Sequence, residues 1–167
     1  MKIEDNFLGH KEFDELQALM MGYDFAWYYN SEIVSGDKKD KFQFTHMFYH
    51  NYAPQSELCE NLAPILEIMN PISLSRIKAN LLTKTPTIVE NKFHIDMDGM
   101  SEEKLKQWTT SIFYVNTNNG YTKFEDGTIV ESVANRMVTF PSNMKHLGTS
   151  CTDEKTRVVI NFNYIKQ

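Results

Sequence analysis

The sequence predicts a mainly β fold, in which N-terminal helices pack against a jelly roll of antiparallel strands. From Ser73 onward, apolar and polar residues alternate with a period of two. Turn signals separate these runs at intervals of roughly ten residues, which is typical of sandwiches and barrels of antiparallel strands. Before Ser73, spacing and capping signals indicate two helices.

The first helix is expected over residues 10–21. Phe13, Leu16 and Met20 recur at the spacing that places side chains on one face of a helix, and Gly22 follows as a stop signal. This apolar face is expected to pack on the sheet.

The second helix is expected over residues 57–69. Ser56 is a suitable N-cap, and Asn70 followed by proline ends the segment. Pro64 lies inside the run and lacks a backbone N–H, so the helix should kink or restart there.

The expected strands are short and rich in β-branched and aromatic residues. They cover residues 25–30, 41–50, 72–82, 109–116, 121–127, 128–133, 136–142 and 156–165. Turn signals between them are Asn118-Asn119-Gly120, Glu125-Asp126-Gly127 and Ala134-Asn135. The polar stretch 35–41 is expected to be an exposed loop.

Length and composition limit the classes of protein. The 167 residues suit one domain, with residues 1–72 as helical and strand support and residues 73–165 as the jelly-roll core. No apolar run approaches the roughly 20 residues that span a bilayer, so no membrane partner is expected. The net charge of −5 leaves nucleic acid possible as a partner but disfavours it. Two cysteines and no signal peptide favour a cytoplasmic location.

A possible metal site begins with His94 and Asp96, which are two residues apart. On a strand, such side chains leave the same face with Cα atoms roughly 6.5 Å apart, whereas on a helix they would diverge. His146 would have to arrive from a distant strand. Two imidazoles and one carboxylate can hold Fe(II) on one face and leave the other open, although Zn(II) also binds such ligands. Asp98 is assigned to a turn because Gly99 follows it.

Arg157 enters an apolar strand. Its own face carries Val159 and Asn161, while Val158 and Ile160 lie on the other. An arginine in this position requires an anionic partner or exposure to solvent, and its guanidinium can clamp a carboxylate with two hydrogen bonds. A salt bridge at the strand end is the alternative.

Two further groups of polar residues leave alternatives open. Arg76, Lys78 and Asn80 share one strand face; they are expected to be solvated or salt-bridged, or to touch an anionic substrate if this face looks into the jelly roll. His46 and His50 lie roughly 13 Å apart on a strand, too far to chelate one ion, and are expected to be structural or on the substrate side.

These residues together resemble the Fe(II)/2-oxoglutarate-dependent dioxygenases. The resemblance is nearest to the prolyl-4-hydroxylase-like branch and to small stand-alone oxygenases encoded by phages. It covers roughly residues 73–165. The motifs that carry it are FHID, TTSIFYVNTNNGYTKFEDG, FPSNMKHLGTS and TRVVINFNY.

The resemblance implies a double-stranded β-helix and a role for seven side chains. The implied iron ligands are His94, Asp96 and His146. The implied contacts of 2-oxoglutarate are Arg157, which would bind the distal carboxylate, and Tyr114, Asn80 and Asn161. Tyr114 has the alternative of being a core tyrosine.

The resemblance also implies the chemistry. With Fe(II), 2-oxoglutarate and O2, such an enzyme hydroxylates a substrate and releases succinate and CO2. A protein or peptide side chain such as proline is the first expectation for the substrate, followed by a nucleobase and by a free amino acid or other small molecule. Asp96 favours hydroxylation over halogenation, because related halogenases lack this carboxylate. A cupin-like or silent metal-binding jelly roll without keto-acid chemistry is the alternative. The oligomeric state stays open, and a phage-encoded enzyme would act in the host cytoplasm.

Overall fold

Two antiparallel sheets form the framework of the molecule. The computed structural model describes residues 1–34, 41–97 and 99–167. The strands of the larger sheet are, in spatial order, β1 (Lys2–Glu4), β9 (Arg136–Pro141), β6 (Thr109–Tyr114), β11 (Thr156–Ile165), β5 (Ser73–Thr83), β3 (Gln43–His50) and β2 (Tyr28–Asn30), with β4 (Ala53–Pro54) paired to β3. The strands of the smaller sheet are β10 (His146–Gly148), β7 (Tyr121–Phe124) and β8 (Ile129–Glu131). This arrangement confirms the mainly β jelly roll.

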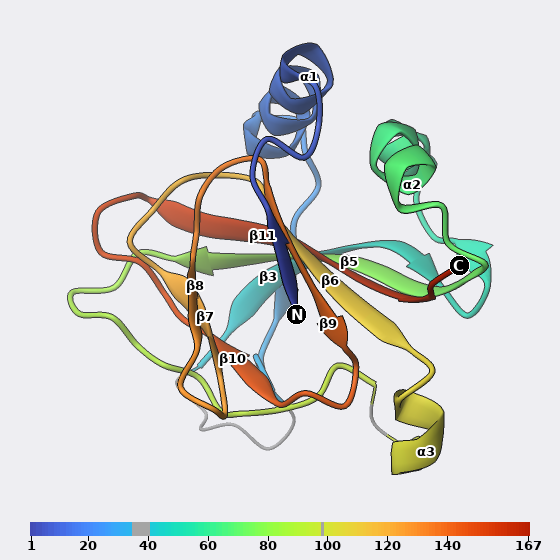
Figure 1. Cartoon of the computed structure of the whole chain (residues 1–167). Helices are drawn as coiled ribbons and strands as arrows, with labels where there is room; N and C mark the ends of the chain where they lie inside the picture. Colours follow the sequence, from blue (N-terminus) through green and yellow to red (C-terminus); the bar gives the residue numbers. More distant parts are fainter. Residues whose placement is uncertain (35–40, 98) are drawn as a thin grey trace.

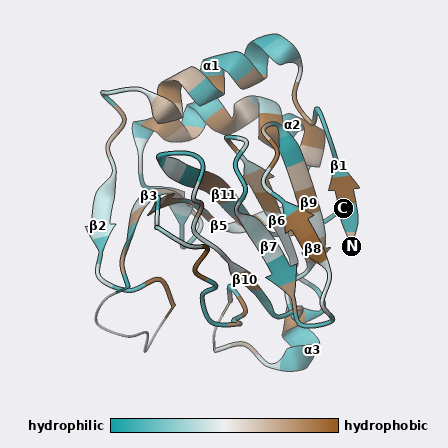
Figure 2. Cartoon of the chain, turned by 90° about the vertical axis from the view of Figure 1, so that its left-hand side faces the viewer, coloured by the Kyte–Doolittle hydropathy of each residue, from teal (hydrophilic) through white to brown (hydrophobic). Residues whose placement is uncertain are grey.

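The two sides of the larger sheet are covered differently. The helices α1 (His10–Met21) and α2 (Ala63–Met69) lie on one side, and the smaller sheet lies on the other (Figure 1). The short helix α3 (Glu102–Leu105) lies at the end of the molecule opposite α1 (Figure 2). No helix in the described part of the chain is long and apolar enough to cross a membrane.

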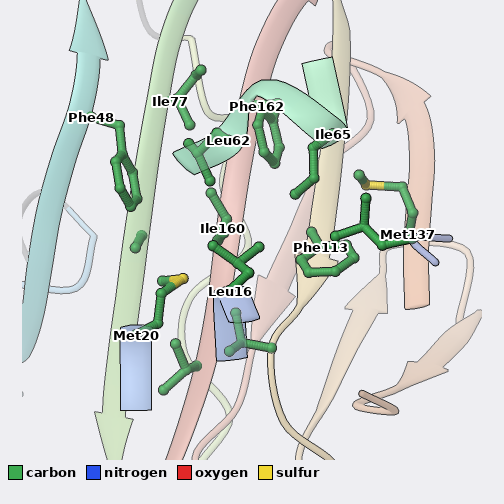
Figure 3. Close-up of a cluster of buried hydrophobic side chains, with 14 of the residues drawn as sticks. Leu16, Met20, Phe48, Leu62, Ile65, Ile77, Phe113, Met137, Ile160 and Phe162 are labelled. Carbon is green, nitrogen blue, oxygen red and sulfur yellow. The ribbon is translucent and has the colours of Figure 1, made fainter. Parts of the chain in front are cut away.

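The main hydrophobic core fills the space between the helices and the larger sheet. Leu16 and Met20 of α1 point toward Ile160 and Phe113 of the sheet (Figure 3). Other fully buried members of this cluster are Phe48, Leu62, Ile65, Ile77 and Phe162. Burial of this apolar surface is the main source of stability for such a domain.

A second core lies between the two sheets. Ile112, Tyr114 and Val159 of the larger sheet pack here with Phe124 and Val130 of the smaller one. Strand β11 therefore serves both cores, because alternate side chains leave opposite faces of a strand. The alternation predicted around Arg157 is confirmed: Val158 and Ile160 belong to the helix-side core, and Val159 to the core between the sheets.

The helix predictions agree closely with the structure. Helix α1 has the predicted bounds. The Ser56 hydroxyl accepts a hydrogen bond from the Leu58 backbone N–H at 3.2 Å, as expected of an N-cap. The chain runs as a 3-10 helix over Glu57–Leu62 and restarts as α2 with Pro64 in its first turn. Asn70 ends α2 in the left-handed conformation.

Some elements differ from the predictions. The strand expected at 25–30 is reduced to Tyr28–Asn30, which pairs with only one neighbour, β3. Strand β1 and helix α3 were not predicted, because segments of three and four residues show no periodicity. Residues 35–40 of the loop expected at 35–41, and the turn expected at Asp98, lie outside the described residues.

Candidate functional site

His94 and His146 lie next to each other although 52 positions separate them in the sequence. Their backbones form an antiparallel bridge, in which each N–H donates to the other residue's carbonyl at 3.0 Å. The imidazole centroids are 4.8 Å apart. The prediction that His146 arrives from a distant strand is confirmed, because it is the first residue of β10. His94 forms a single bridge rather than part of a longer strand, and the chain bends at Asp96.

Asp96 completes a cluster of three metal-binding side chains. One carboxylate oxygen lies 3.8 Å from His94 Nε2, and the other lies 3.9 Å from His146 Nε2. One potential donor atom from each residue falls within 4.8 Å of the other two. Donor atoms at this separation can share one ion without large movement of the backbone.

Hydrogen bonds to backbone carbonyls set the orientation of both imidazoles. His94 Nδ1 lies 3.0 Å from the Lys92 carbonyl, and His146 Nδ1 lies 3.2 Å from the Met144 carbonyl. A carbonyl can only accept, so each Nδ1 carries the hydrogen and each Nε2 presents a lone pair to the cluster. Such outer bonds are what metal-binding histidines usually have.

The charges around Asp96 keep its carboxylate ionised. An Arg76 nitrogen lies 3.2 Å from Oδ1, and the Asn161 amide donates to Oδ2 at 3.3 Å. Burial alone would raise the pKa of Asp96, but the nearby basic groups, first His146 and then Arg76, lower it to about 2. Burial also lowers the pKa of His146, which favours the neutral imidazole that binds metals. The expectation that Arg76 forms a salt bridge is confirmed.

Arg157 is a buried cation without an acidic partner in the described residues. It is 3 % exposed. Its Nε donates to the Ser132 hydroxyl at 2.8 Å, and a terminal nitrogen donates to the Thr122 hydroxyl at 3.1 Å. No carboxylate in the described ranges comes within 4.0 Å of the guanidinium, so the alternative of a strand-end salt bridge is not what the structure shows. Burying an arginine in this way is unfavourable unless an anion joins it.

Glycines make room for this side chain. A Cβ at Gly120 would lie 2.7 Å from Arg157 Cδ and 2.6 Å from the Ser150 carbonyl oxygen. A Cβ at Gly148 would lie 3.3 Å from a terminal nitrogen of Arg157. The space beside the guanidinium therefore depends on the absence of side chains at these two positions.

One cleft between the sheets joins the cluster to Arg157. Among its lining residues are the two histidines, Asp96 and Arg157. Asn80, predicted from the polar face of its strand, also lines the cleft. Asn161 lines it too, but its amide group faces Asp96.

Tyr114 is fully buried beside Arg157. Its hydroxyl donates to the Thr122 hydroxyl at 2.8 Å, and the Arg157 guanidinium carbon lies 5.7 Å from the centroid of its ring. Tyr114 belongs to the core between the sheets, as the core alternative expects. A hydrogen bond from its hydroxyl to the co-substrate stays a prediction.

His46 is part of the core and lies away from the cleft. Its ring nitrogens lie 2.8 Å from the Ala26 carbonyl oxygen and 2.9 Å from the Ser56 hydroxyl, and its ring packs against Phe25 and Phe48. The structural alternative for this histidine therefore agrees with the structure.

The sequence reasoning missed Thr122 and Ser132, which hold Arg157 in place. Threonine and serine on short strands carry no distinguishing local signal. Their role depends on β7 and the end of β8 lying against β11, a long-range arrangement that a single sequence does not reveal.

Comparison with known proteins gives matches in structure but not in sequence. No family model matches the chain, and no curated protein matches it. A prolyl-4-hydroxylase from Pseudomonas putida has a TM-score of 0.65 and 14% identity, over 99% of this chain and 91% of that one. A prolyl hydroxylase from Trichoplax adhaerens, in complex with a hypoxia inducible factor peptide fragment, has a TM-score of 0.65 and 13% identity, over 99% and 83%. The non-haem α-ketoglutarate-dependent carbocyclase SnoK from nogalamycin biosynthesis has a TM-score of 0.68 and 13% identity, over 98% and 78%.

Identities this low establish the fold and leave the chemistry to the site. The structures matched include a 2OG-Fe(II) oxygenase from Burkholderia pseudomallei as well as the two prolyl hydroxylases. The chain has the double-stranded β-helix fold of the Fe(II)/2-oxoglutarate oxygenases, with prolyl 4-hydroxylases among its structural neighbours.

Proposed function

We propose that the chain is an Fe(II)- and 2-oxoglutarate-dependent dioxygenase that hydroxylates a protein or peptide side chain such as proline. The observation that carries this proposal is the pairing of two features in one cleft. One is the cluster of His94, Asp96 and His146, and the other is the buried guanidinium of Arg157, which has no acidic partner among the described residues.

The three-residue cluster fits Fe(II). Two neutral imidazoles and one carboxylate on one side of an ion leave positions free on the other side for a co-substrate and O2. The hydrogen bonds that hold each Nδ1 would keep both Nε2 lone pairs directed at the ion. Zn(II) would also bind these donors, so the assignment of iron rests on the presence of Arg157 as well.

Arg157 and its neighbours fit the distal carboxylate of 2-oxoglutarate. The Thr122 hydroxyl already accepts hydrogen bonds from Tyr114 and Arg157, so its own hydrogen is free to be donated to an anion. A carboxylate bound here would satisfy the buried charge of Arg157. Asn80 lines the cleft and is assigned to the same co-substrate, whereas Asn161 is assigned to orienting Asp96.

In this proposal, iron and 2-oxoglutarate together supply the oxidising power, with succinate and CO2 as co-products. The chain's own residues bind the ion, orient the keto acid and exclude water from the cleft. The first substrate class is taken from the structural neighbours, one of which is bound to a peptide. The carbocyclase SnoK shares the fold, so the fold by itself does not select the reaction.

Succinate formation from 2-oxoglutarate tests the proposed function. Protein loaded with Fe(II) should produce succinate in air, and a pool of proline-containing peptides should gain the mass of one oxygen atom. Arg157→Ala should raise the apparent KM for 2-oxoglutarate about 10- to 100-fold, because a charge-assisted contact worth about 1.5–3 kcal/mol is lost. Arg136→Lys is the matched control, since Arg136 pairs with Asp5 on the surface.

Two outcomes would contradict the proposal. The first is succinate formation no higher than in an Asp96→Ala variant that lacks the carboxylate. The second is an equal KM for 2-oxoglutarate in the wild type and in Arg157→Ala.

A further inference from the structure

Lys78 is a second cation of the cleft, and the proposed co-substrate chemistry does not use it. It lies on β5 between Arg76 and Asn80 and lines the same cleft as the metal-binding cluster. It is half-buried, and its ammonium makes no hydrogen bond and no ion pair within 4.0 Å in the described part of the chain. The expectation of a solvated or salt-bridged row is therefore confirmed for Arg76 but not for Lys78.

The surroundings of Lys78 make its charge costly. Burial lowers the pKa of Lys78 to about 8, the nearby charge of Arg76 adds to this effect, and Asp96 opposes it. Asp96 is not a close partner of Lys78: the two form no ion pair within 4.0 Å, and the Asp96 carboxylate contacts Arg76 and Asn161 instead. An ammonium held in a cleft under these conditions is stabilised by an incoming anion.

The position of Lys78 separates it from the carboxylate assigned to Arg157. Lys78 pairs with Asn161 across β5 and β11, whereas Arg157 pairs with Leu82. Lys78 and Leu82 are four positions apart, which is about 13 Å along a strand. The Arg157 guanidinium is also held toward the hydroxyls of Ser132 and Thr122, so we treat an anion at Lys78 as distinct from the one at Arg157.

The cleft also stays positively charged when it is loaded. A divalent ion, Lys78 and Arg157 stand against Asp96 and a 2-oxoglutarate dianion, which leaves an excess of positive charge. The positive charge of Lys78 lies on the β5 side of the metal-binding cluster. There Lys78 pairs with Asn161 across β5 and β11, and the Asn161 amide donates to Asp96. A positive charge in this position attracts a negatively charged substrate and disfavours a neutral one by comparison.

We propose that Lys78 binds a carboxylate of the substrate, and so selects substrates that carry an acidic group close to the carbon that is hydroxylated. This inference rests on the proposed function. The carboxylate can come from an acidic side chain next to the target residue in a peptide, or from the α-carboxylate of a free amino acid. Both sources present the same chemistry to Lys78.

The test compares probes that differ in one charge. The protein is loaded with Mn(II) and N-oxalylglycine, which stand in for Fe(II) and 2-oxoglutarate without turnover. The peptide pair is acetyl-Pro-Asp-amide and acetyl-Pro-Asn-amide, and the amino-acid pair is L-proline and L-prolinamide. Binding beside the metal is measured as broadening of the probe's proton NMR signals by Mn(II). The variants are Lys78→Met, which keeps the length of the stem, Lys78→Arg, which keeps the charge, and Lys11→Met on exposed α1 as the control.

The wild type and Lys11→Met should bind the carboxylate member of one pair at least about 10-fold more tightly than its amide, as a hydrogen bond to a charged group implies. Lys78→Met should lose this preference, and Lys78→Arg should keep most of it. A preference in the peptide pair identifies an acidic peptide as the source, and a preference in the proline pair identifies a free amino acid.

Three results would overturn this inference while leaving the proposed function standing. One is normal binding of N-oxalylglycine with no charge preference in either pair, which the wild type alone can show even if a variant fails to fold. Another is a preference that persists in Lys78→Met. The third is a loss of N-oxalylglycine affinity in Lys78→Met as large as in Arg157→Ala, which would assign Lys78 to the co-substrate. Absence of N-oxalylglycine binding in the wild type would instead contradict the proposed function itself.

Discussion

At the scale of single residues, the cleft contains two buried charged groups, Asp96 and Arg157, with different surroundings. Asp96 is surrounded by compensating groups, with Arg76 at 3.2 Å and the Asn161 amide at 3.3 Å. In the described ranges, the hydrogen-bond partners of Arg157 are neutral, namely the hydroxyls of Ser132 and Thr122. A buried carboxylate whose charge is balanced by neighbouring groups is suited to be a permanent metal ligand. A buried cation whose charge is not balanced is suited to bind an anionic co-substrate that arrives and leaves.

Replacement of His146 tests the metal site. His146→Ala removes one of three donors, so we expect Fe(II) content after anaerobic loading and desalting to fall to the level of protein without a site. His10→Ala is the control, because His10 is exposed at the start of α1. Iron content measured by a colorimetric chelator gives the answer. Equal iron in the wild type and in His146→Ala would remove this residue from the ligand set.

Replacement of Gly120 tests the space beside Arg157. The added methyl of Gly120→Ala would lie 2.7 Å from Arg157 Cδ and 2.6 Å from a backbone oxygen, so the arginine must shift. We expect weaker 2-oxoglutarate binding, by roughly 10-fold as for a lost hydrogen bond to a charged group, with Fe(II) binding unchanged. Calorimetric titration of Mn(II)-loaded protein with 2-oxoglutarate measures the co-substrate affinity, and a colorimetric chelator measures the iron retained after anaerobic loading. Gly9→Ala is the control, since its added methyl would meet only the flexible side chain of Glu12. Unchanged affinity in Gly120→Ala would show that the space is not needed.

At the scale of elements, β11 connects the core to the site. Its alternation places apolar residues against the helices and Arg157 and Asn161 in the cleft. Helix α1 contributes Leu16 and Met20 to the main core (Figure 3). This core and the cleft lie on opposite sides of the larger sheet. Stability and site geometry are thus carried by opposite faces of one sheet.

Truncation in α1 should therefore reduce stability without altering the site. Leu16 is 4 % exposed, and Leu16→Ala is expected to cost about 2–5 kcal/mol of unfolding free energy through lost burial and a cavity. Urea denaturation measures this cost, and Glu15→Ala on the exposed face is the control. Iron bound per folded molecule should stay the same. A loss of iron binding in folded Leu16→Ala would show that the two faces are coupled.

The elements also show what a single sequence can predict. Helix α1, the N-cap at Ser56, the restart at Pro64 and the alternation of β11 follow from local rules, and the structure has them all. The joining of His94, Asp96 and His146 in one cluster was predicted from residue types and spacing, and the structure brings them together. The bridge between His94 and His146 and the hydroxyls around Arg157 were not predicted, because they depend on how distant segments pair. Whether Lys78 would face the cleft or solvent also depended on this pairing.

At the scale of the whole molecule, the fold admits several reactions. Its structural neighbours, which share the fold, include prolyl hydroxylases, a carbocyclase and an epimerase. The assignment of this chain as an oxygenase therefore rests on whether iron and 2-oxoglutarate occupy one cleft together, and the assignment of its substrate rests on the charge that Lys78 adds there.

The measurement that tests the central claim most directly is an anaerobic titration of Fe(II)-loaded protein with 2-oxoglutarate, followed by visible absorption. When a keto acid chelates iron in such a site, a weak metal-to-ligand charge-transfer band appears. We expect this band in the wild type, a right-shifted titration in Arg157→Ala, and no band in Asp96→Ala or His146→Ala. Absence of the band in wild-type protein that has bound iron would contradict the account, and would indicate a metal-binding jelly roll in which Arg157 has a purely structural role.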